Sequence, residues 1–153
     1  MEQIKLQAFQ NSLNYLFKET FEGSPASGSI YLDRGIGIFN TIADLDAEAA
    51  SKQMFGATIA AHTDHLRYYL DVLSNFLKGT VQIANWQRSW EIKHVSEDEW
   101  KAIKRELRKT YDSAVKGFKD VTEWDEDKIS EAMAMVVHSA YHLSAIRQIA
   151  KGA

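Results

Sequence analysis

The sequence predicts an all-α protein, a four-helix bundle in a single domain over residues 1–153. Four stretches repeat apolar residues at spacings of three and four, the period of an amphipathic helix of roughly 20 residues. The only proline, Pro25, leaves most of the chain free to be helical. No apolar run approaches the roughly 20 residues that span a bilayer, so the helices are expected to pack against one another.

The first predicted helix covers residues 2–22, and a Gly-Ser-Pro run ends it. A long connection over 30–53 follows. It contains two weak helical pieces, 36–45 and 46–51, and Asp46 is suited to cap the second. A connection of this length in a compact domain is typical of a crossover or a functional cover.

The second long helix is predicted over residues 55–78, and Gly79 closes it. Its apolar seam has spacings of four and three and includes a histidine. The seam consists of Phe55, Ile59, His62, Leu66, Tyr69, Leu73 and Phe76. A second histidine, His65, lies beside the seam on a neighbouring stripe.

The third helix is predicted to begin after Ser96, which forms a capping box with Glu99, and to continue to about Val121. Asp125 is suited to cap the fourth helix, which is expected over about 126–150. The inner seam of the fourth helix also contains histidines. It consists of Met135, His138, His142, Ala145 and Ile149. The short connection predicts that the third and fourth helices are antiparallel neighbours, while the long first connection permits a crossover.

Composition narrows the classes of function. The formal net charge is -3, so the chain lacks the basic surface that nucleic-acid binding requires. There is no cysteine, which removes disulfides and thiolate metal ligands and fits a reducing cytoplasm. The N-terminus carries early charge and no apolar signal core, so secretion is not expected. Four tryptophans fall near helix ends. They are predicted to seal the connections, with a dimer surface or a substrate lid as the alternative.

The histidines predict a metal site. His138 and His142 are four residues apart, so both imidazoles project from one face of a helix. A third ligand, His62, would complete a three-nitrogen set with a position open for water or substrate. Zinc is the first expectation, and imidazole also suits nickel, iron and copper. His65 is the rival of His62, and it could instead contact substrate or support a ligand.

Two further side chains are candidates for roles near this site, Arg147 and His94. Arg147 could steer an anionic group, although a cation near the end of a helix also interacts favourably with the helix dipole. His94 stands in an irregular segment, and an exposed position is expected for it. His65 is the best candidate for a general acid or base.

Two segments of this chain resemble the DinB/YfiT-type superfamily of bacterial four-helix bundles. They are Ala61-His62-Thr63-Asp64-His65-Leu66-Arg67-Tyr68-Tyr69-Leu70 and Val137-His138-Ser139-Ala140-Tyr141-His142-Leu143-Ser144-Ala145-Ile146-Arg147-Gln148. The resemblance extends over nearly the whole chain and is least specific in the first helix.

The resemblance implies a divalent metal bound by His62, His138 and His142 at one end of an up-down-down-up bundle. It also implies a homodimer. Characterised members of the family include metal-dependent transferases and isomerases that use a low-molecular-weight thiol. The function expected for this chain is therefore metal binding, with thiol-dependent transfer to an electrophilic small molecule. The alternative is a metal-binding, stress-related protein without catalysis.

Overall fold

The computed structural model describes residues 2–54 and 56–152, and most of them are helical. The long helices are α1 (Glu2–Glu22), α4 (Ile59–Leu77), α5 (Glu97–Asp120) and α6 (Glu126–Gly152). The short elements are α2 (Ile38–Ala43), α3 (Ala47–Ser51), β1 (Gln53–Met54), β2 (Ala57–Thr58) and the 3-10 turn η1 (Arg88–Trp90). The prediction of an all-α protein is confirmed. Among the described helices, none is long and apolar enough to cross a membrane.

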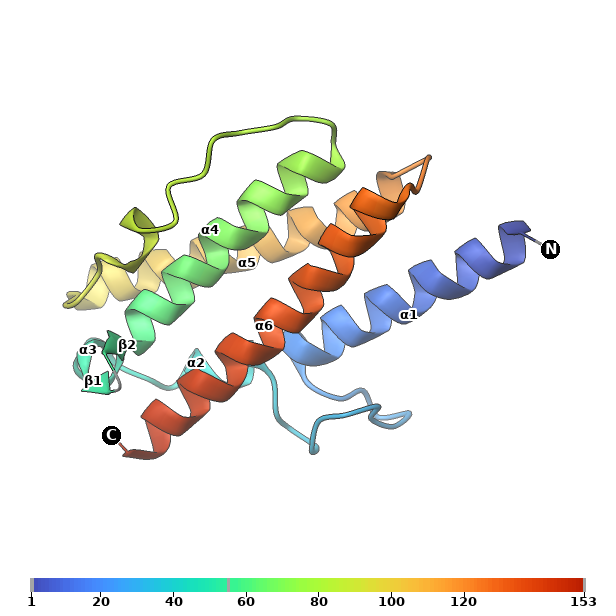
Figure 1. The fold of residues 1–153 in the computed structure, drawn as a ribbon. Helices are drawn as coiled ribbons and strands as arrows, with labels where there is room; N and C mark the ends of the chain where they lie inside the picture. The colour runs from blue at the N-terminus through green and yellow to red at the C-terminus, as the bar shows by residue number, and fades with distance from the viewer. Residues whose placement is uncertain (1, 55, 153) are drawn as a thin grey trace.

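The four long helices lie side by side in two directions. Figure 1 shows that α1 and α6 run one way, while α4 and α5 run the other. Helix α4 packs against both α5 and α6, and α1 packs against α6 and α5. The segment between α4 and α5 returns along the outside of α4 and carries η1 with it (Figure 1).

The neighbours of α5 differ from the sequence-based expectation. Helix α6 does run antiparallel to α5, but α5 packs chiefly on α4 and has no extensive contact with α6 in the described part of the chain. The connection 121–125 allows this because an extended chain of that length spans about 17 Å, which is more than the distance between adjacent helices. A short connection therefore did not require direct packing.

The predicted caps are confirmed. Ser96 Oγ accepts a hydrogen bond from the Glu99 N–H at 3.3 Å, and the Glu99 carboxylate accepts one from the Ser96 N–H at 2.7 Å. Asp46 accepts from the Ala49 N–H at 2.8 Å, and Asp125 accepts from the Lys128 N–H at 2.8 Å. These carboxylate and hydroxyl oxygens satisfy backbone donors that a helix start leaves without intrahelical partners.

Helix α4 begins four residues later than the predicted start at residue 55. Strands β1 and β2 pair antiparallel before it, with Gln53 opposite Thr58 and Met54 opposite Ala57. Gly56 turns this hairpin with a φ of 90°, a conformation that glycine adopts without strain. Thr58 then caps α4 by accepting from the Ala61 N–H at 3.0 Å. The predicted seam residue Phe55 lies outside the described residues.

The core is built where the predicted seams meet. An aromatic group from α1 and α5 fills one part of it, with Phe17 stacked on Tyr111 at 5.4 Å and edge-on to Phe118 at 5.2 Å between ring centroids. Leu66 of α4 and Met135 of α6 are fully buried in the same core. Each such side chain contributes roughly 1.5–3 kcal/mol through burial of apolar surface.

Candidate metal centre

Four histidines gather where α4 packs against α6. His62 and His65 are three residues apart on α4, and His138 and His142 are four apart on α6, so each pair shares one helix face. The two faces meet, and the ring centroids of His65 lie 5.3 Å from His138 and 5.1 Å from His142. His62, His65 and His142 are buried, and His138 is half-buried at the edge of the group.

His142 lies at the centre of the group and is fully buried. Its Nε2 atom is 3.0 Å from His138 Nε2, and its Nδ1 atom is 2.9 Å from His62 Nδ1. The two neighbours therefore lie at opposite edges of the His142 ring. Nitrogens that share a tetrahedral zinc ion lie about 3.3 Å apart, so the spacing of His138 and His142 is close to that of two ligands.

One set of three histidines can hold a metal ion. His65, His138 and His142 each offer a ring nitrogen, and these atoms all lie within 4.8 Å of one another. The predicted set contained His62 in place of His65. The difference arises because His62 faces Nδ1 of His142, while His138 faces Nε2, so no single nitrogen of His142 serves both partners. If Nε2 of His142 held a metal, its Nδ1–H would donate to His62 Nδ1, which lies 2.9 Å away.

Ser89, which no sequence pattern indicates, orients His65. The Ser89 Oγ–H donates to the backbone carbonyl of Trp86 at 2.6 Å. Since a hydroxyl has one proton, Ser89 can only accept from His65 Nδ1, which lies 2.6 Å from Oγ. The proton of His65 is therefore on Nδ1, and the lone pair of Nε2 remains for a metal. This tautomer follows from the hydrogen-bond network.

The segment that carries Ser89 is held on α4 by its own hydrogen bonds. The Tyr68 hydroxyl accepts from the Asn85 N–H at 2.9 Å, and the Asn85 side chain accepts from the Arg88 N–H at 3.1 Å. The second bond closes a turn that leads into η1. No apolar period marks this segment. The signal in the sequence that could have indicated its position beside the histidines is a turn-forming Asn85 four residues before Ser89.

Aromatic rings enclose the histidines. Trp90 stacks on His65 with centroids 4.1 Å apart, and Tyr69 stacks on His138 at 3.7 Å. Trp90 also meets His62 edge-on at 5.2 Å, and Trp86 lies over Tyr69 at 5.6 Å. Trp86 and Trp90 thus cover the histidine group, whereas Trp100 and Trp124 pack at helix ends as the sequence predicted.

Burial keeps the imidazoles neutral. Desolvation lowers the pKa of all four histidines, because the interior disfavours the charged form. The pKa of His65 falls to about 4, by desolvation first and then by repulsion from His138 and His62. The pKa of His142 is lowered furthest, for the same reasons. Neutral imidazoles are the form that binds a metal, so the group is ready for one at neutral pH.

These pKa shifts predict a loss of stability in acid for the metal-free protein. The unfolded chain binds protons at its histidines below the ordinary pKa of 6.5, while folded His65 resists protonation until about pH 4. The stability that the folded state gains from keeping these histidines neutral is fully present above pH 6.5 and is lost as pH falls toward 4. Urea unfolding at pH 7 and pH 5 measures it. His142→Leu should reduce the difference, and His94→Leu, at an exposed loop residue, should not.

The remaining candidates lie outside the histidine group. Arg147 is half-buried on α6 and has no hydrogen bond or ion pair with the four histidines in the described structure. His94 is exposed between η1 and α5, as expected. Asp64 pairs with Arg67 at 2.6 Å.

Comparison with models of protein families, with curated proteins and with solved structures found no match to this chain.

Proposed function

We propose that the chain binds one divalent metal ion through His65, His138 and His142. The observation that carries this proposal is the convergence of three ligand nitrogens within 4.8 Å of one another. Zinc is the first candidate, because it accepts three neutral imidazoles and keeps a fourth position open. Nickel and iron accept the same ligands.

The donor set fits such an ion in three respects. Ser89 leaves His65 Nε2 free of a proton, and His62 is placed to accept the Nδ1–H of His142. Burial holds each imidazole neutral. His138 is half-buried, so the set is open to solvent on its side. A bound ion would act as a Lewis acid and lower the pKa of a water or thiol at that position.

Zinc titration of chelator-treated protein tests the proposal. We expect one zinc per chain, with a dissociation constant between about micromolar and nanomolar for three ligands. His138→Ala should weaken this binding strongly, because it removes one of the three ligands. The variant should still fold, because His138 is half-exposed and its loss leaves little cavity. His94→Ala, at an exposed histidine, should bind as the wild type does. Binding that His138→Ala leaves unchanged would overturn the proposal.

Ser89→Ala should lower the zinc affinity by about 10-fold, the loss typical of a residue that orients a ligand. Without the hydroxyl, His65 is free to carry its proton on Nε2, which is the atom that a metal needs. Competition with a chromophoric chelator measures the change. Ser144→Ala, at an exposed serine of α6, is the matched control. An affinity equal to that of Ser144→Ala would show that the hydroxyl does not set the tautomer.

We also propose that the four long helices form a DinB/YfiT-type bundle with up-down-down-up topology. The opposed directions of the pair α1 and α6 and the pair α4 and α5 support this proposal. The accompanying function is metal-dependent transfer of a low-molecular-weight thiol to an electrophile. The open position of the three-nitrogen set supports this transfer function. In it, His65 acts as a metal ligand and not as a general acid or base.

Thiol-dependent turnover separates catalysis from metal binding alone. The zinc-loaded protein is assayed with glutathione, bacillithiol and mycothiol against a panel of electrophiles. We expect turnover that requires both zinc and His65, with His94→Ala fully active. Absence of turnover in every combination, with zinc bound, would leave the non-catalytic metal-binding function.

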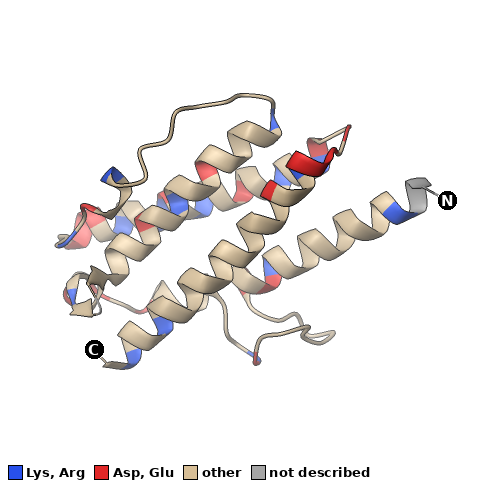
Figure 2. Ribbon diagram, in the orientation of Figure 1, with Lys and Arg blue, Asp and Glu red and all other residues tan. Residues whose placement is uncertain are grey.

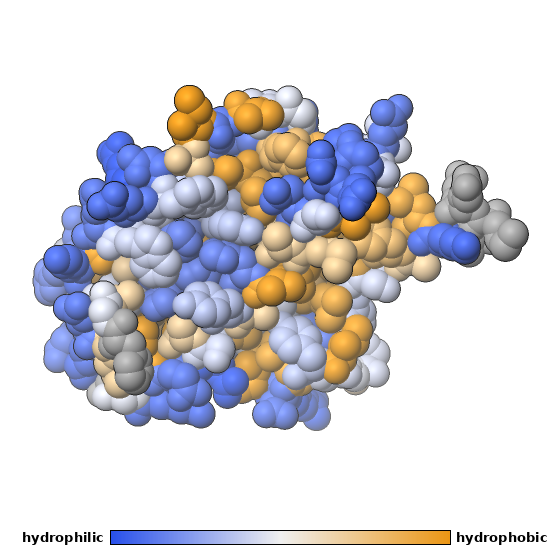
Figure 3. Space-filling model, viewed as in Figure 1, coloured by the Kyte–Doolittle hydropathy of each residue, from blue (hydrophilic) through white to orange (hydrophobic). Residues whose placement is uncertain are grey.

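A homodimer is part of the same proposal, and one surface supports it. Three large side chains one turn apart on α6 are exposed, namely Met133, Val137 and Tyr141. Figure 2 shows no charged residue along the middle of α6, and Figure 3 shows apolar surface on this side of the molecule. An apolar helix face of this kind is typical of a contact surface. Sedimentation equilibrium of the wild type and Val137→Glu tests it, with a monomeric variant expected.

A further inference from the structure

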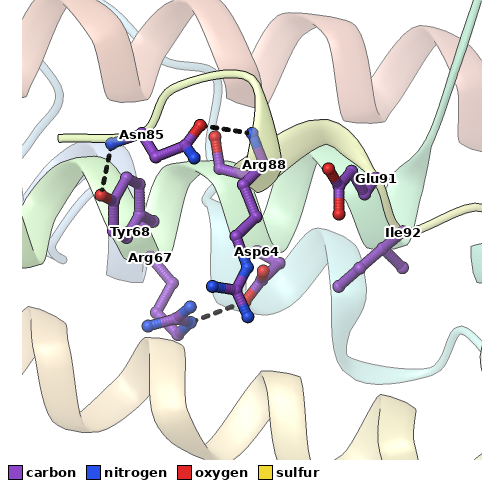
Figure 4. A pocket seen from close by; sticks show the side chains of 8 residues that line it. Asp64, Arg67, Tyr68, Asn85, Arg88, Glu91 and Ile92 are labelled. Carbon is purple, nitrogen blue, oxygen red and sulfur yellow. Dashed lines mark hydrogen bonds and ion pairs between the residues drawn. The ribbon is translucent and has the colours of Figure 1, made fainter.

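A cavity of about 540 Å³ lies between α4 and the segment that follows it, close to the histidine group. Helix α4 contributes Asp64, Arg67 and Tyr68 to its walls. The segment after α4 contributes Asn85, Arg88, Ser89, Glu91 and Ile92 (Figure 4). Ser89 connects the cavity to the histidine group, because it lines the cavity and its hydroxyl contacts His65. Cavities of this size hold small molecules.

One end of the cavity offers hydrogen-bond donors. Figure 4 shows Arg88 extending from the loop toward the pair formed by Asp64 and Arg67. In the described structure, the Arg88 guanidinium has no ion-pair partner, and Arg67 uses only Nε for Asp64. The Tyr68 hydroxyl accepts from the Asn85 N–H and keeps its own proton to donate. These groups suit a carboxylate, which arginine binds through two parallel bonds.

The other end offers an acceptor. Glu91 stands there beside Ile92, and its carboxylate has no hydrogen-bond or ion-pair partner among the described residues. Two acidic and two basic side chains line the cavity, so their formal charges cancel. A purely anionic ligand would face Glu91 and Asp64, and a purely cationic one would face the two arginines. The lining is therefore complementary to a molecule that carries both charges.

We propose that this cavity binds a small zwitterion, with its carboxylate on Arg88 and its ammonium group on Glu91. This is the chemistry of a free amino acid. The ring of Tyr68 and the side chain of Ile92 provide apolar surface for an aliphatic group. The proposal does not depend on a bound metal, because no wall residue is one of the three metal ligands.

Three matched ligands test the charge requirement on chelator-treated wild-type protein. L-Leucine carries both charges, L-leucinamide lacks the carboxylate, and 4-methylpentanoate lacks the ammonium group. Titrations followed by ¹H–¹⁵N NMR should show L-leucine binding at about millimolar concentration, with each analogue at least about 10-fold weaker. The shifted backbone amides should belong to residues 64–68 and 85–92. Equal binding of an analogue, shifts elsewhere or no saturable binding of L-leucine would overturn the proposal.

Two variants assign the charges. Arg88→Gln should bind L-leucine no more tightly than the wild type binds leucinamide, and Glu91→Gln should bind it like the wild type binds 4-methylpentanoate. Both residues are exposed, so folding is not at stake. Arg34→Gln, at an exposed arginine outside the cavity, should keep wild-type binding. Wild-type affinity in Arg88→Gln or Glu91→Gln would contradict the assignment. Zinc binding by the same variants shows whether the metal centre is intact.

Discussion

Zinc should raise the midpoint of thermal unfolding of the wild-type protein by about 10 °C and should leave that of His142→Leu unchanged. Free zinc at about 1,000 times its dissociation constant stabilises the folded state by about 4 kcal/mol. In a chain of 153 residues, each kcal/mol raises the midpoint by roughly 2–4 °C. His142 is the proposed ligand that contacts both His138 and His62, and leucine fills its buried position without offering a nitrogen.

The matched control is His94→Leu, the same substitution at an exposed histidine of the connection to α5. It should keep the full zinc-dependent rise. Differential scanning calorimetry with and without zinc measures the effect for each protein against its own metal-free form, so a change in intrinsic stability cancels. An equal rise in His142→Leu would mean that zinc stabilises the fold through other residues.

Glu19→Gln should destabilise the folded state by about 2–4 kcal/mol, because Glu19 is a buried carboxylate that anchors the chain after α1. Its oxygens accept hydrogen bonds from the backbone N–H groups of Ile30, Tyr31 and Leu32 at 3.0, 3.1 and 2.9 Å, in that order. They also accept one from the Ser29 hydroxyl at 2.9 Å. In glutamine the amide oxygen can replace Oε1, but the NH₂ group then faces the Ile30 N–H in place of Oε2, and the negative charge that strengthens all of these hydrogen bonds is lost.

The effect of Glu19 depends on pH in a defined direction. Desolvation raises the pKa of its carboxyl group, but the hydrogen bonds from the backbone outweigh it and hold the pKa below the ordinary 4.5. The stabilisation is therefore present above pH 4.5 and is lost as pH falls through the folded-state pKa. Urea unfolding at pH 7 and in acid should show the two proteins converging. Glu123→Gln, at an exposed glutamate, is the control and should match the wild type at both pH values.

Much of the fold could be predicted because periodicity and capping chemistry are local. The bounds of α1 and α6 and the caps at Ser96 and Asp125 agree with the sequence-based prediction to within a few residues. The late start of α4 was missed because a hairpin with strands of two residues leaves no alternating pattern to detect. The packing of α5 on α4 was missed because it depends on how all four helices pack together.

The candidate site was predictable in its composition and less so in its geometry. Spacing alone identified His138 and His142 as a pair and pointed to α4 as the source of a third nitrogen. It favoured His62 over His65 because His62 lies in the apolar seam of α4, although residues three apart share a face. The choice depends on which edge of the His142 ring each one meets. Ser89 lies in the short 3-10 turn η1, which no sequence period marks, and only the folded chain shows that it orients His65.

The zinc affinities of His65→Ala and His62→Ala, measured side by side by chelator competition, test the assignment of ligands most directly. Removing a ligand should weaken zinc binding by about 10²- to 10³-fold, because each ligand supplies part of the binding free energy of the site. Removing a supporting hydrogen-bond acceptor should weaken it by only about 10-fold. We predict the larger loss for His65→Ala. A larger loss for His62→Ala, with His65→Ala close to wild type, would contradict the proposed centre and favour His62 as the third ligand.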